Sequence, residues 1–314
     1  MQLAVPSNDA SPQCLSRESA NFVSLITPNS VKISIVTPTF NSALTLRETL
    51  ESVETQDHPD VEHLVIDGGS TDGTLEILKE FNRVDWISEH DEGHYHAMNK
   101  GIAMATGDVI GVLNGDDCYT PGTLSAVADA FEQHPEWDAL IGDIIYVDGT
   151  GNEIFRRQEA RWDPQIIRLG FALNHQTLFV RRSTLKQLGP FRYRDFKNTC
   201  DYEFFMRLAH SGSKVGTLRR YVVRYRFHEF GQSADRRVAH NMQRECEAIR
   251  KEYGVPGGLV GKALELYARG KRQMEKLIIL GKVDLIPGRV HLRRHMRERT
   301  TFSSNVGVND LEDV

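Results

Sequence analysis

The stretch 108-DVIGVLNGDD-117 joins an apolar run to a polar turn, and the fold of the chain can be inferred outward from it. The run from Val109 to Leu113 is rich in β-branched residues and has the length of a buried strand. Asp116 and Asp117 follow it, directly after a glycine. Neighbouring carboxylates repel each other unless a positive charge lies close by. The stretch therefore predicts either a solvated turn or a site for a divalent cation.

Two similar runs lie upstream, at 32–37 (KISIVT) and 62–67 (EHLVID), and helical patterns separate the three runs. Strands that alternate with helices predict an α/β protein with a Rossmann-like, mostly parallel sheet flanked by helices. Ligands of such sheets bind beyond the carboxyl ends of the strands. Pro38, Asp67 and residues 114–117 would all lie at those ends. The convergence of three strand ends predicts a functional site at this edge.

Composition limits the classes of protein that this chain can belong to. It has 314 residues, of which 40% are hydrophobic and 26% charged, with a net charge of -5. That balance predicts a globular protein and argues against nucleic-acid binding. The four cysteines have neither zinc-site spacing nor the density of a disulfide framework, which favours a reducing, cytoplasmic setting. No apolar run reaches the roughly 20 residues that a membrane-spanning helix requires.

The chain divides into three predicted parts. Residues 1–30 are polar and are expected to form a poorly ordered extension. Residues 31–232 carry the strand and helix pattern, and residues 233–314 form a helical, basic C-terminal extension. Between 258 and 300 there are eleven Lys or Arg against four Asp or Glu. We expect this extension either to contact an anionic membrane surface peripherally or to pack on the domain or a partner chain.

Two common nucleotide motifs are absent from the sequence. There is no G-x-x-x-x-G-K-[ST] loop, and no G-x-G-x-x-G follows the first predicted strand. The acidic turn at 114–117 instead fits Mn2+ or Mg2+. These ions bind through one or two carboxylates and complete their shells with water and substrate phosphates.

Five segments, in this order, resemble the nucleotide-sugar domain of the family-2 glycosyltransferases of GT-A fold. They are SIVTPTFNSALTLRETLESV (34–53), VIDGGSTDGT (65–74), SEHDEGHYHAMNKGIAMATGDVIGVLNGDD (88–117), HQTLFVRRS (175–183) and CDYEFFMRL (200–208). The resemblance runs from about Val31 to about Gln232, roughly two-thirds of the chain. It implies an inverting, metal-dependent enzyme of the hexosyltransferase type.

The resemblance also implies residues that bind the nucleotide-sugar donor. Thr37 and Pro38 would line the pocket for the base, and Asp67 would hydrogen-bond that base. The segment DEGHYHAMNKG would add further donor contacts, from Asp91, Asn99 and Lys100.

The triplet at 114–116 occupies the position of the family's D-x-D motif. Asp116 would coordinate the metal that bridges the diphosphate, whereas Asn114, in place of the first aspartate, can hydrogen-bond a ribose. Asp117 is expected to support the loop or the donor sugar. His228 is a further candidate metal ligand, and His175 is predicted as a hydrogen-bonded structural histidine.

The resemblance assigns the catalytic base to Asp201. Cys200 replaces the acidic residue that usually precedes it, and Glu203 is a second candidate for the base. With one base and no enzyme nucleophile, the expected reaction is a single displacement with inversion at the anomeric carbon.

The predicted function is transfer of a sugar from a nucleotide sugar, expected to be UDP-linked, to a hydroxyl. The acceptor would be a glycan or a polyprenyl-linked glycan in polysaccharide biosynthesis, at the cytoplasmic face of the membrane. Two alternatives remain open. A nucleotidyltransferase would use a nucleoside triphosphate, although "TPTFNSA" (37–43) has neither glycine nor lysine in its first loop. A non-catalytic nucleotide-sugar-binding scaffold protein would fit Asn114 and Cys200.

Overall fold

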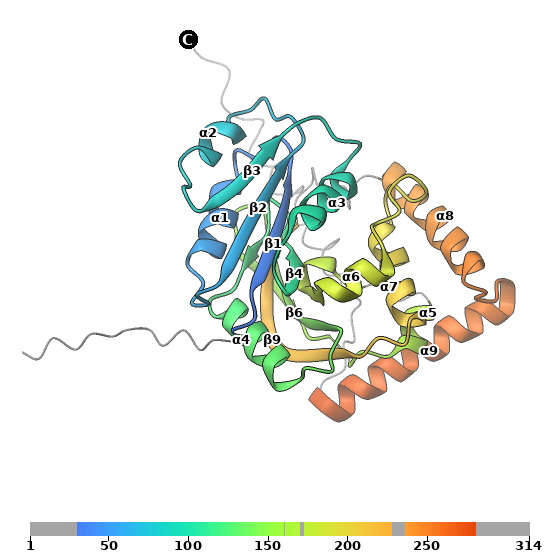
Figure 1. The fold of residues 1–314 in the computed structure, drawn as a ribbon. Helices are drawn as coiled ribbons and strands as arrows, with labels where there is room; N and C mark the ends of the chain where they lie inside the picture. The colour runs from blue at the N-terminus through green and yellow to red at the C-terminus, as the bar shows by residue number, and fades with distance from the viewer. Residues whose placement is uncertain (1–29, 160, 170–172, 228–235, 281–314) are drawn as a thin grey trace, which may run out of the picture. The chain divides into compact units, whose positions relative to one another are not determined.

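The computed structural model describes residues 30–159, 161–169, 173–227 and 236–280. Within them lies one nine-stranded mixed sheet of order β3-β2-β1-β4-β8-β6-β9-β5, with β7 paired to β6 (Figure 1). The strands are β1 (Ile33–Thr39), β2 (Val61–Asp67), β3 (Val84–Ser88), β4 (Val109–Val112), β5 (Cys118–Tyr119), β6 (Ala139–Val147), β7 (Glu153–Arg157), β8 (Leu178–Arg181) and β9 (Val215–Arg226).

The first four strands are parallel to one another. Strand β1 pairs with β2 on one side and β4 on the other, and β2 pairs with β3. β1 is buried along its whole length and β2 from His63 to Asp67, because both faces of the sheet are covered by helices. Parallel pairing places the carboxyl ends of all four strands at one edge, which is the edge that the sequence predicts for the site.

Helices cover both faces of this sheet (Figure 1). They are α1 (Leu46–Glu54), α2 (Thr74–Leu78), α3 (His94–Met104), α4 (Thr123–Gln133), α5 (Pro164–Arg168), α6 (Arg182–Leu188), α7 (Cys200–His210), α8 (Arg236–Glu252) and α9 (Gly258–Leu280), with a 3-10 turn η1 (His175–Thr177). Helices α1, α2 and α4 pack on one face of the sheet. Helices α3, α5, α6 and α7 pack on the other, and α8 adds Ile249 to that second core.

The backbone of helix α3 lies close to the sheet at Gly101. A Cβ atom there would lie 2.3 Å from Val36 Cγ1 and 3.1 Å from Ile66 Cγ1. Only glycine lets the α3 backbone rest directly on β1 and β2. This contact sets the distance between α3 and the sheet. The first residues of α3 are His94 and Tyr95.

The strands predicted at 32–37, 62–67 and 108–114 are present as β1, β2 and β4, so the predicted α/β fold class is confirmed. β3 was not predicted. The division at residues 30 and 232 stays a prediction, and the described part of the C-terminal extension consists of α8 and α9. Among the described residues, no helix is both long and apolar enough to cross a membrane.

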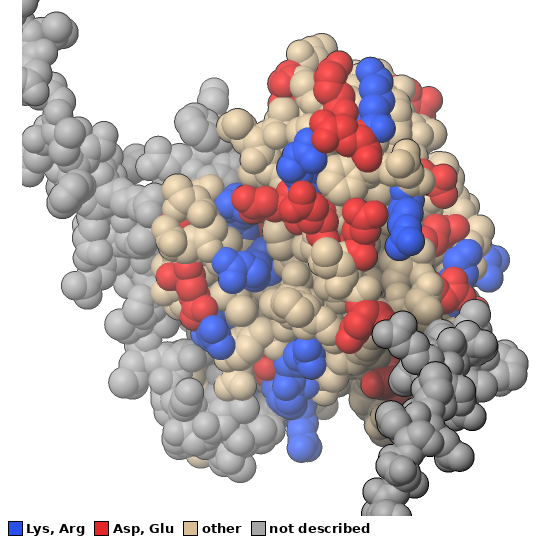
Figure 2. Space-filling model, turned by 90° about the vertical axis from the view of Figure 1, so that its left-hand side faces the viewer, with Lys and Arg blue, Asp and Glu red and all other residues tan. Residues whose placement is uncertain are grey.

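Figure 2 shows the face that carries α1 and α2, where acidic and basic side chains alternate. Several of these charges form pairs across short distances, such as Arg47 Nη2 to Glu80 Oε2 at 2.7 Å and Lys79 Nζ to Glu76 Oε1 at 3.9 Å. This face therefore presents no continuous basic surface.

Candidate active site

The pairing register brings the predicted strand-end residues together. Thr39 is opposite Asp67 in the β1–β2 pair. Beyond β4, the Gly115 N–H donates to the Pro38 carbonyl at 3.3 Å. A Cβ atom on Gly115 would lie 2.8 Å from Thr39 Oγ1, so glycine allows the acidic turn to lie against the end of β1. Residues from three strands thus share one edge.

The side chains of Thr37 and Asp67 are engaged within the protein. Thr37 Oγ1 lies 2.9 Å from His63 Nε2, and both residues are buried. The buried Asp67 carboxylate accepts hydrogen bonds from the Gly69 and Ser70 N–H groups at 3.0 and 2.9 Å. It also accepts from Ser88 Oγ at 2.6 Å. Asp67 therefore folds the turn after β2, and its contact with a base stays a prediction.

Asp91 lies against the same turn, because a Cβ atom on Gly68 would be 2.8 Å from Asp91 Oδ2. Its other oxygen caps the start of α3 by accepting from the Gly93 N–H at 2.8 Å. Lys100 is only 17% exposed, and its Nζ lies 2.9 Å from Glu89 Oε1. Asp91 and Lys100 thus flank the edge of the sheet from the segment around α3.

Asn99 makes two hydrogen bonds within the protein. Its amide nitrogen donates to the Phe191 carbonyl, and its amide oxygen accepts from the Phe191 N–H, both at 2.8 Å. This double hydrogen bond ties α3 to the segment before α7. A donor contact by Asn99 stays a prediction.

The acidic turn after β4 is held by a network of hydrogen bonds. Asp117 is buried and accepts from the Arg226 N–H at 2.8 Å and from Gln176 Nε2 at 3.1 Å. Burial and the neighbouring charge of Asp116 raise the pKa of Asp117 well above its usual value. Arg226, itself buried, also donates from Nε to the Asp116 carbonyl at 3.1 Å and pairs with Glu48. Of the two acidic residues, Asp117 is thus the one whose side chain holds the turn in place.

Asp116 is partly exposed and lies in the turn that Asp117 and Arg226 hold. Among the described residues, no group of three or more His, Cys, Asp or Glu side chains could hold a metal by itself. The turn therefore does not fit a cage made only of protein ligands. It does fit Mn2+ or Mg2+ held by one carboxylate, water and substrate phosphates. His228, the other predicted ligand, lies outside the described residues.

The predicted base, Asp201, lies in the first turn of α7 and close to His175. Its Oδ2 is 3.5 Å from His175 Nδ1, and its Oδ1 accepts from the Tyr202 N–H at 2.8 Å. Burial opposes ionisation of this carboxyl. Hydrogen bonds from His175, Tyr95 and the Tyr202 N–H, with the charge of His175, outweigh burial and hold the pKa of Asp201 below its usual value. The side chain is 23% exposed, so an ionised carboxylate can reach a ligand.

Glu203, the second candidate for the base, lies on the buried side of α7. It is fully buried, and its oxygens contact Arg207 Nη2 at 2.9 Å and the Tyr253 hydroxyl at 2.8 Å. The contact with Tyr253 joins α7 to the residue that follows α8. Cys200 is also buried, and burial raises the pKa of its thiol above the usual range. The geometry favours Asp201 over Glu203 as the base.

His175 connects the acidic turn to Asp201. Its Nε2 lies 3.3 Å from Asn114 Oδ1, while its Nδ1 faces Asp201. The predicted role of a hydrogen-bonded histidine agrees with this, but its two partners were not foreseen. Arg226 and Tyr95 were missed entirely. The only available signal for Arg226 was a cation at the end of a strand.

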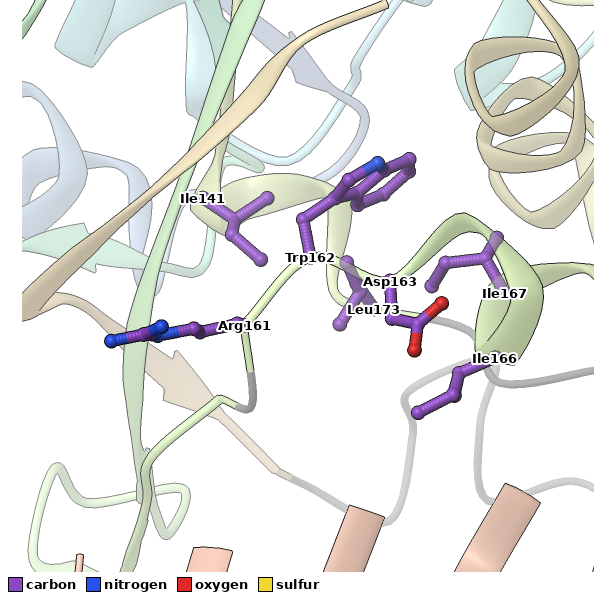
Figure 3. A pocket seen from close by; sticks show the side chains of 7 residues that line it. All are labelled: Ile141, Arg161, Trp162, Asp163, Ile166, Ile167 and Leu173. Atoms are coloured by element: carbon purple, nitrogen blue, oxygen red, sulfur yellow. The ribbon is translucent and has the colours of Figure 1, made fainter. Parts of the chain in front are cut away.

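A separate pocket lies between β6 and α5 (Figure 3). Its lining residues are Ile141, Arg161, Trp162, Asp163, Ile166, Ile167 and Leu173. None of them is a predicted site residue. Lys271 of α9 reaches this region and forms an ion pair with Asp163 at 2.5 Å. The pocket is therefore not part of the candidate active site.

Residues 34–198 match the family model described as glycosyl transferase family 2, which is more than half of the chain. The chain belongs to glycosyl transferase family 2. This confirms the resemblance seen in the sequence and makes the chain a glycosyltransferase. Asn114, Asp116 and the turn around Asp67 all lie within the matched residues.

Curated relatives of this family-2 member share about one third of aligned residues. A PGL/p-HBAD biosynthesis glycosyltransferase of Mycobacterium bovis is 34% identical over 208 residues, covering 63% of this chain and 77% of the relative. The O-antigen biosynthesis protein RfbC of Myxococcus xanthus is 34% identical over 191 residues, covering 59% of this chain and 15% of that protein.

Solved structures agree with the GT-A fold of this family-2 chain. S. aureus TarS 1-349, in complex with UDP-GlcNAc, aligns with a TM-score of 0.55 at 21% identity, covering 78% of this chain and 81% of TarS. The mannosyltransferase PcManGT from Pyrobaculum calidifontis, in complex with GDP-Man and Mn2+, gives 0.51 at 16% identity, covering 80% and 86%.

Proposed function

We propose that this protein transfers a sugar from a UDP-sugar to a hydroxyl of a glycan or lipid-linked acceptor, with inversion. The observation that carries the proposal is that His175 joins the acidic turn to Asp201, with Nε2 3.3 Å from Asn114 Oδ1 and Nδ1 3.5 Å from Asp201 Oδ2. Asp116 lies in a firmly held turn, and the partly exposed Asp201 has a lowered pKa. The first suits a metal and a diphosphate, and the second suits a general base.

The donor would lie across the carboxyl ends of β1, β2 and β4. The base would occupy the region of Thr37, Pro38 and Asp67, and the diphosphate would face Asp116 and Lys100. The UDP-GlcNAc complex of TarS supports a uracil nucleotide, and the GDP-Man and Mn2+ complex of PcManGT supports a guanine nucleotide and a metal. We favour UDP because TarS aligns with the higher TM-score, 0.55 against 0.51 for PcManGT.

A bound Mn2+ or Mg2+ would supply positive charge for the leaving diphosphate. Asp116 would hold this ion, and Asp117 and Arg226 would keep the turn in place. Lys100 adds a second positive charge at the same edge. Asp201 would take the proton of the acceptor hydroxyl as the hydroxyl attacks the anomeric carbon. Because the proposed site uses one base and no enzyme nucleophile, the product is inverted.

The acceptor is proposed from the relatives' names and from the C-terminal helices. The relatives act in PGL/p-HBAD biosynthesis and in O-antigen biosynthesis. We propose a glycan or polyprenyl-linked acceptor in polysaccharide biosynthesis, met at the cytoplasmic side of a membrane. The exposed apolar side chains of α9, Leu266 and Tyr267 among them, support peripheral contact with that membrane.

The first experiment measures heats of binding of UDP, GDP and UTP, each with Mn2+ and with a chelator. We expect one diphosphate to bind only with the metal, and Asp116→Asn to weaken that binding by about tenfold or more. Asp129→Asn is the matched control, because Asp129 is an exposed aspartate of α4.

Three outcomes would contradict the proposal. If no diphosphate bound in a metal-dependent way, the acidic turn would be only a turn. Preference for UTP with release of pyrophosphate would identify a nucleotidyltransferase. Binding of a UDP-sugar without any turnover would identify a scaffold.

A further inference from the structure

His175 lies between the acidic turn at 114–117 and the proposed base. Its imidazole contacts the side chains of Asn114 and Asp201. Its Nε2 is 3.3 Å from Asn114 Oδ1, and its Nδ1 is 3.5 Å from Asp201 Oδ2. The imidazole is only 12% exposed, whereas Asp201 is 23% exposed. The histidine thus lies behind the carboxylate and leaves the carboxylate accessible.

The backbone around His175 is held on both sides. Within η1, Thr177 donates from its N–H and its hydroxyl to the Asn174 carbonyl, at 3.1 and 2.9 Å. The next residue, Gln176, donates to the buried Asp117 at 3.1 Å. The imidazole therefore takes its position from the acidic turn itself.

Asn114 is suited to this connection because it is an amide. Its Nδ2 faces Asp117 Oδ2 at 3.4 Å, which leaves its Oδ1 to accept from His175. An aspartate at 114 would add a third carboxylate beside Asp116 and Asp117 and would lose the donor toward Asp117. Asparagine in place of the first aspartate of the D-x-D pattern is therefore compatible with the hydrogen bond between Asn114 and His175.

We propose that His175 is a positioning residue that orients Asp201 and keeps it ionised for transfer. This inference rests on the proposed function of the site. In the transfer step, the acceptor O–H bond breaks and its proton goes to an Asp201 oxygen. A new bond forms from the acceptor oxygen to the anomeric carbon, and the electron pair of the broken glycosyl–phosphate bond leaves with the diphosphate. His175 keeps its contact with Asp201 and transfers no atom.

The other groups that face Asp201 do not replace His175. They are His94 and Tyr95 from α3 and Cys200 from α7. Burial lowers the pKa of His94 to about 4, so His94 is neutral near pH 7. Tyr95 and Cys200 are neutral there as well, because burial raises the pKa values of both groups. His175 instead places Nδ1 3.5 Å from Asp201 Oδ2 and Nε2 3.3 Å from Asn114 Oδ1, so it joins Asp201 to the acidic turn.

The test uses the full chain with Mn2+ and follows nucleotide release from UDP-GlcNAc and from GDP-mannose, with water as acceptor. We expect His175→Ala to lower kcat about 10- to 100-fold and to change the donor KM by less than about threefold. Its pH profile should lose activity at a higher pH on the acidic side, because one of the groups that lower the pKa of Asp201 is gone. His175→Asn, which keeps a donor near the Nδ1 position, should recover part of kcat.

Two further variants serve as references for the comparison of wild type with His175→Ala. Asp201→Asn should lose roughly 100- to 10,000-fold in kcat, the usual contribution of a general base. His134→Ala is the matched control, since His134 is 44% exposed at the end of α4. The inference is overturned if Asp201→Asn is inactive while His175→Ala keeps both the wild-type kcat and the wild-type pH profile.

A second measurement does not depend on turnover. The ring 15N resonances of His175, identified by their loss in His175→Gln, are compared between wild type and Asp201→Asn. A displaced Nδ1 resonance supports the contact, and an unchanged one overturns the inference. If the displacement is seen but no donor is bound or hydrolysed, the proposed function fails while the contact between His175 and Asp201 stands.

Discussion

Asp117 and Asp201 show how one chain gives two carboxylates different properties. Burial beside Asp116 raises the pKa of Asp117. Burial also opposes ionisation of Asp201, but His175 and Tyr95 hold the pKa of Asp201 below its usual value. Environments that separate two carboxyl groups in this way assign them different roles. Asp117 is suited to bracing the turn, and Asp201 is suited to accepting a proton.

Another residue-scale effect concerns His63 and acid stability. His63 is buried, and burial lowers its pKa from 6.5 to about 3. Between these two values the unfolded chain binds a proton that the folded chain does not, so stability falls as the pH falls. The loss is at most about 1.4 kcal/mol per pH unit. Urea unfolding at about pH 7 and about pH 5 measures it.

His63→Gln keeps a polar partner for Thr37 and removes this titration. Its free energy of unfolding should therefore depend less steeply on pH than that of the wild type, with His94 still contributing because its pKa is about 4. The exposed His240 of α8, changed to Gln, is the control and should leave the slope as it is. Equal slopes for His63→Gln and wild type would contradict the prediction.

At the scale of elements, strands with continuous β-branched runs were predictable, and strands without them were not. β1 and β2 have the sequences ISIVTPT and VEHLVID and match the expected ranges closely. β3, with the sequence VDWIS, is short, includes a charged residue and is only partly buried at the edge of the sheet. β3 is held in the sheet by its pairing with β2. A local sequence pattern does not predict that pairing.

The same limit applies to the candidate site. Asp67 and residues 114–117 stand out because each follows a strand in the sequence. The contact of His175 with Asp201 joins residues that are separated by a strand, a helix and a loop, with β8 and α6 between them. Arg226 reaches the acidic turn from β9, more than one hundred residues away. Such contacts depend on tertiary packing, and no local spacing predicts them.

Gly101 tests the packing of α3 on the sheet. Gly101→Ala would place a methyl group 2.3 Å from Val36 Cγ1, so α3 must shift or β1 must move. We expect a loss of about 1–3 kcal/mol in the free energy of unfolding, with a lower kcat because Tyr95, a hydrogen-bond partner of Asp201, lies in the first turn of the same helix. Gly270→Ala is the control, because a methyl group at Gly270 would meet no atom within 4 Å and the helix α9 should gain up to about 1 kcal/mol. Similar effects of the two variants would contradict this account.

At the scale of the whole molecule, α9 presents apolar side chains to solvent. Leu259, Val260, Leu266, Tyr267 and Met274 are 86%, 60%, 72%, 61% and 56% exposed. Spacings of seven and eight residues place them on one side of the helix. Ala268, on the opposite side, is fully buried. Such a stripe in a basic segment is typical of a helix that lies on an anionic membrane.

Co-sedimentation with phosphatidylglycerol vesicles tests this surface. We expect the wild type to bind, and Leu266→Glu with Tyr267→Glu to weaken binding by about tenfold or more. Met104→Glu is the control, because Met104 is a 43% exposed apolar residue on α3. Binding that is unaffected by the double variant would show that α9 does not contact the lipid.

The contacts of Glu245 bear on where the chain can be shortened. This residue of α8 accepts from the Asn198 N–H, from Asn198 Nδ2 and from Thr199 Oγ1, all at 2.9 Å. Those groups immediately precede α7, so a helix beyond the region matched by the family model holds the segment that carries Asp201. A fragment that stops after β9 would keep every strand of the sheet and lose this anchor. The smallest active fragment should therefore extend through α8 and Tyr253, whose hydroxyl lies 2.8 Å from the buried Glu203 of α7.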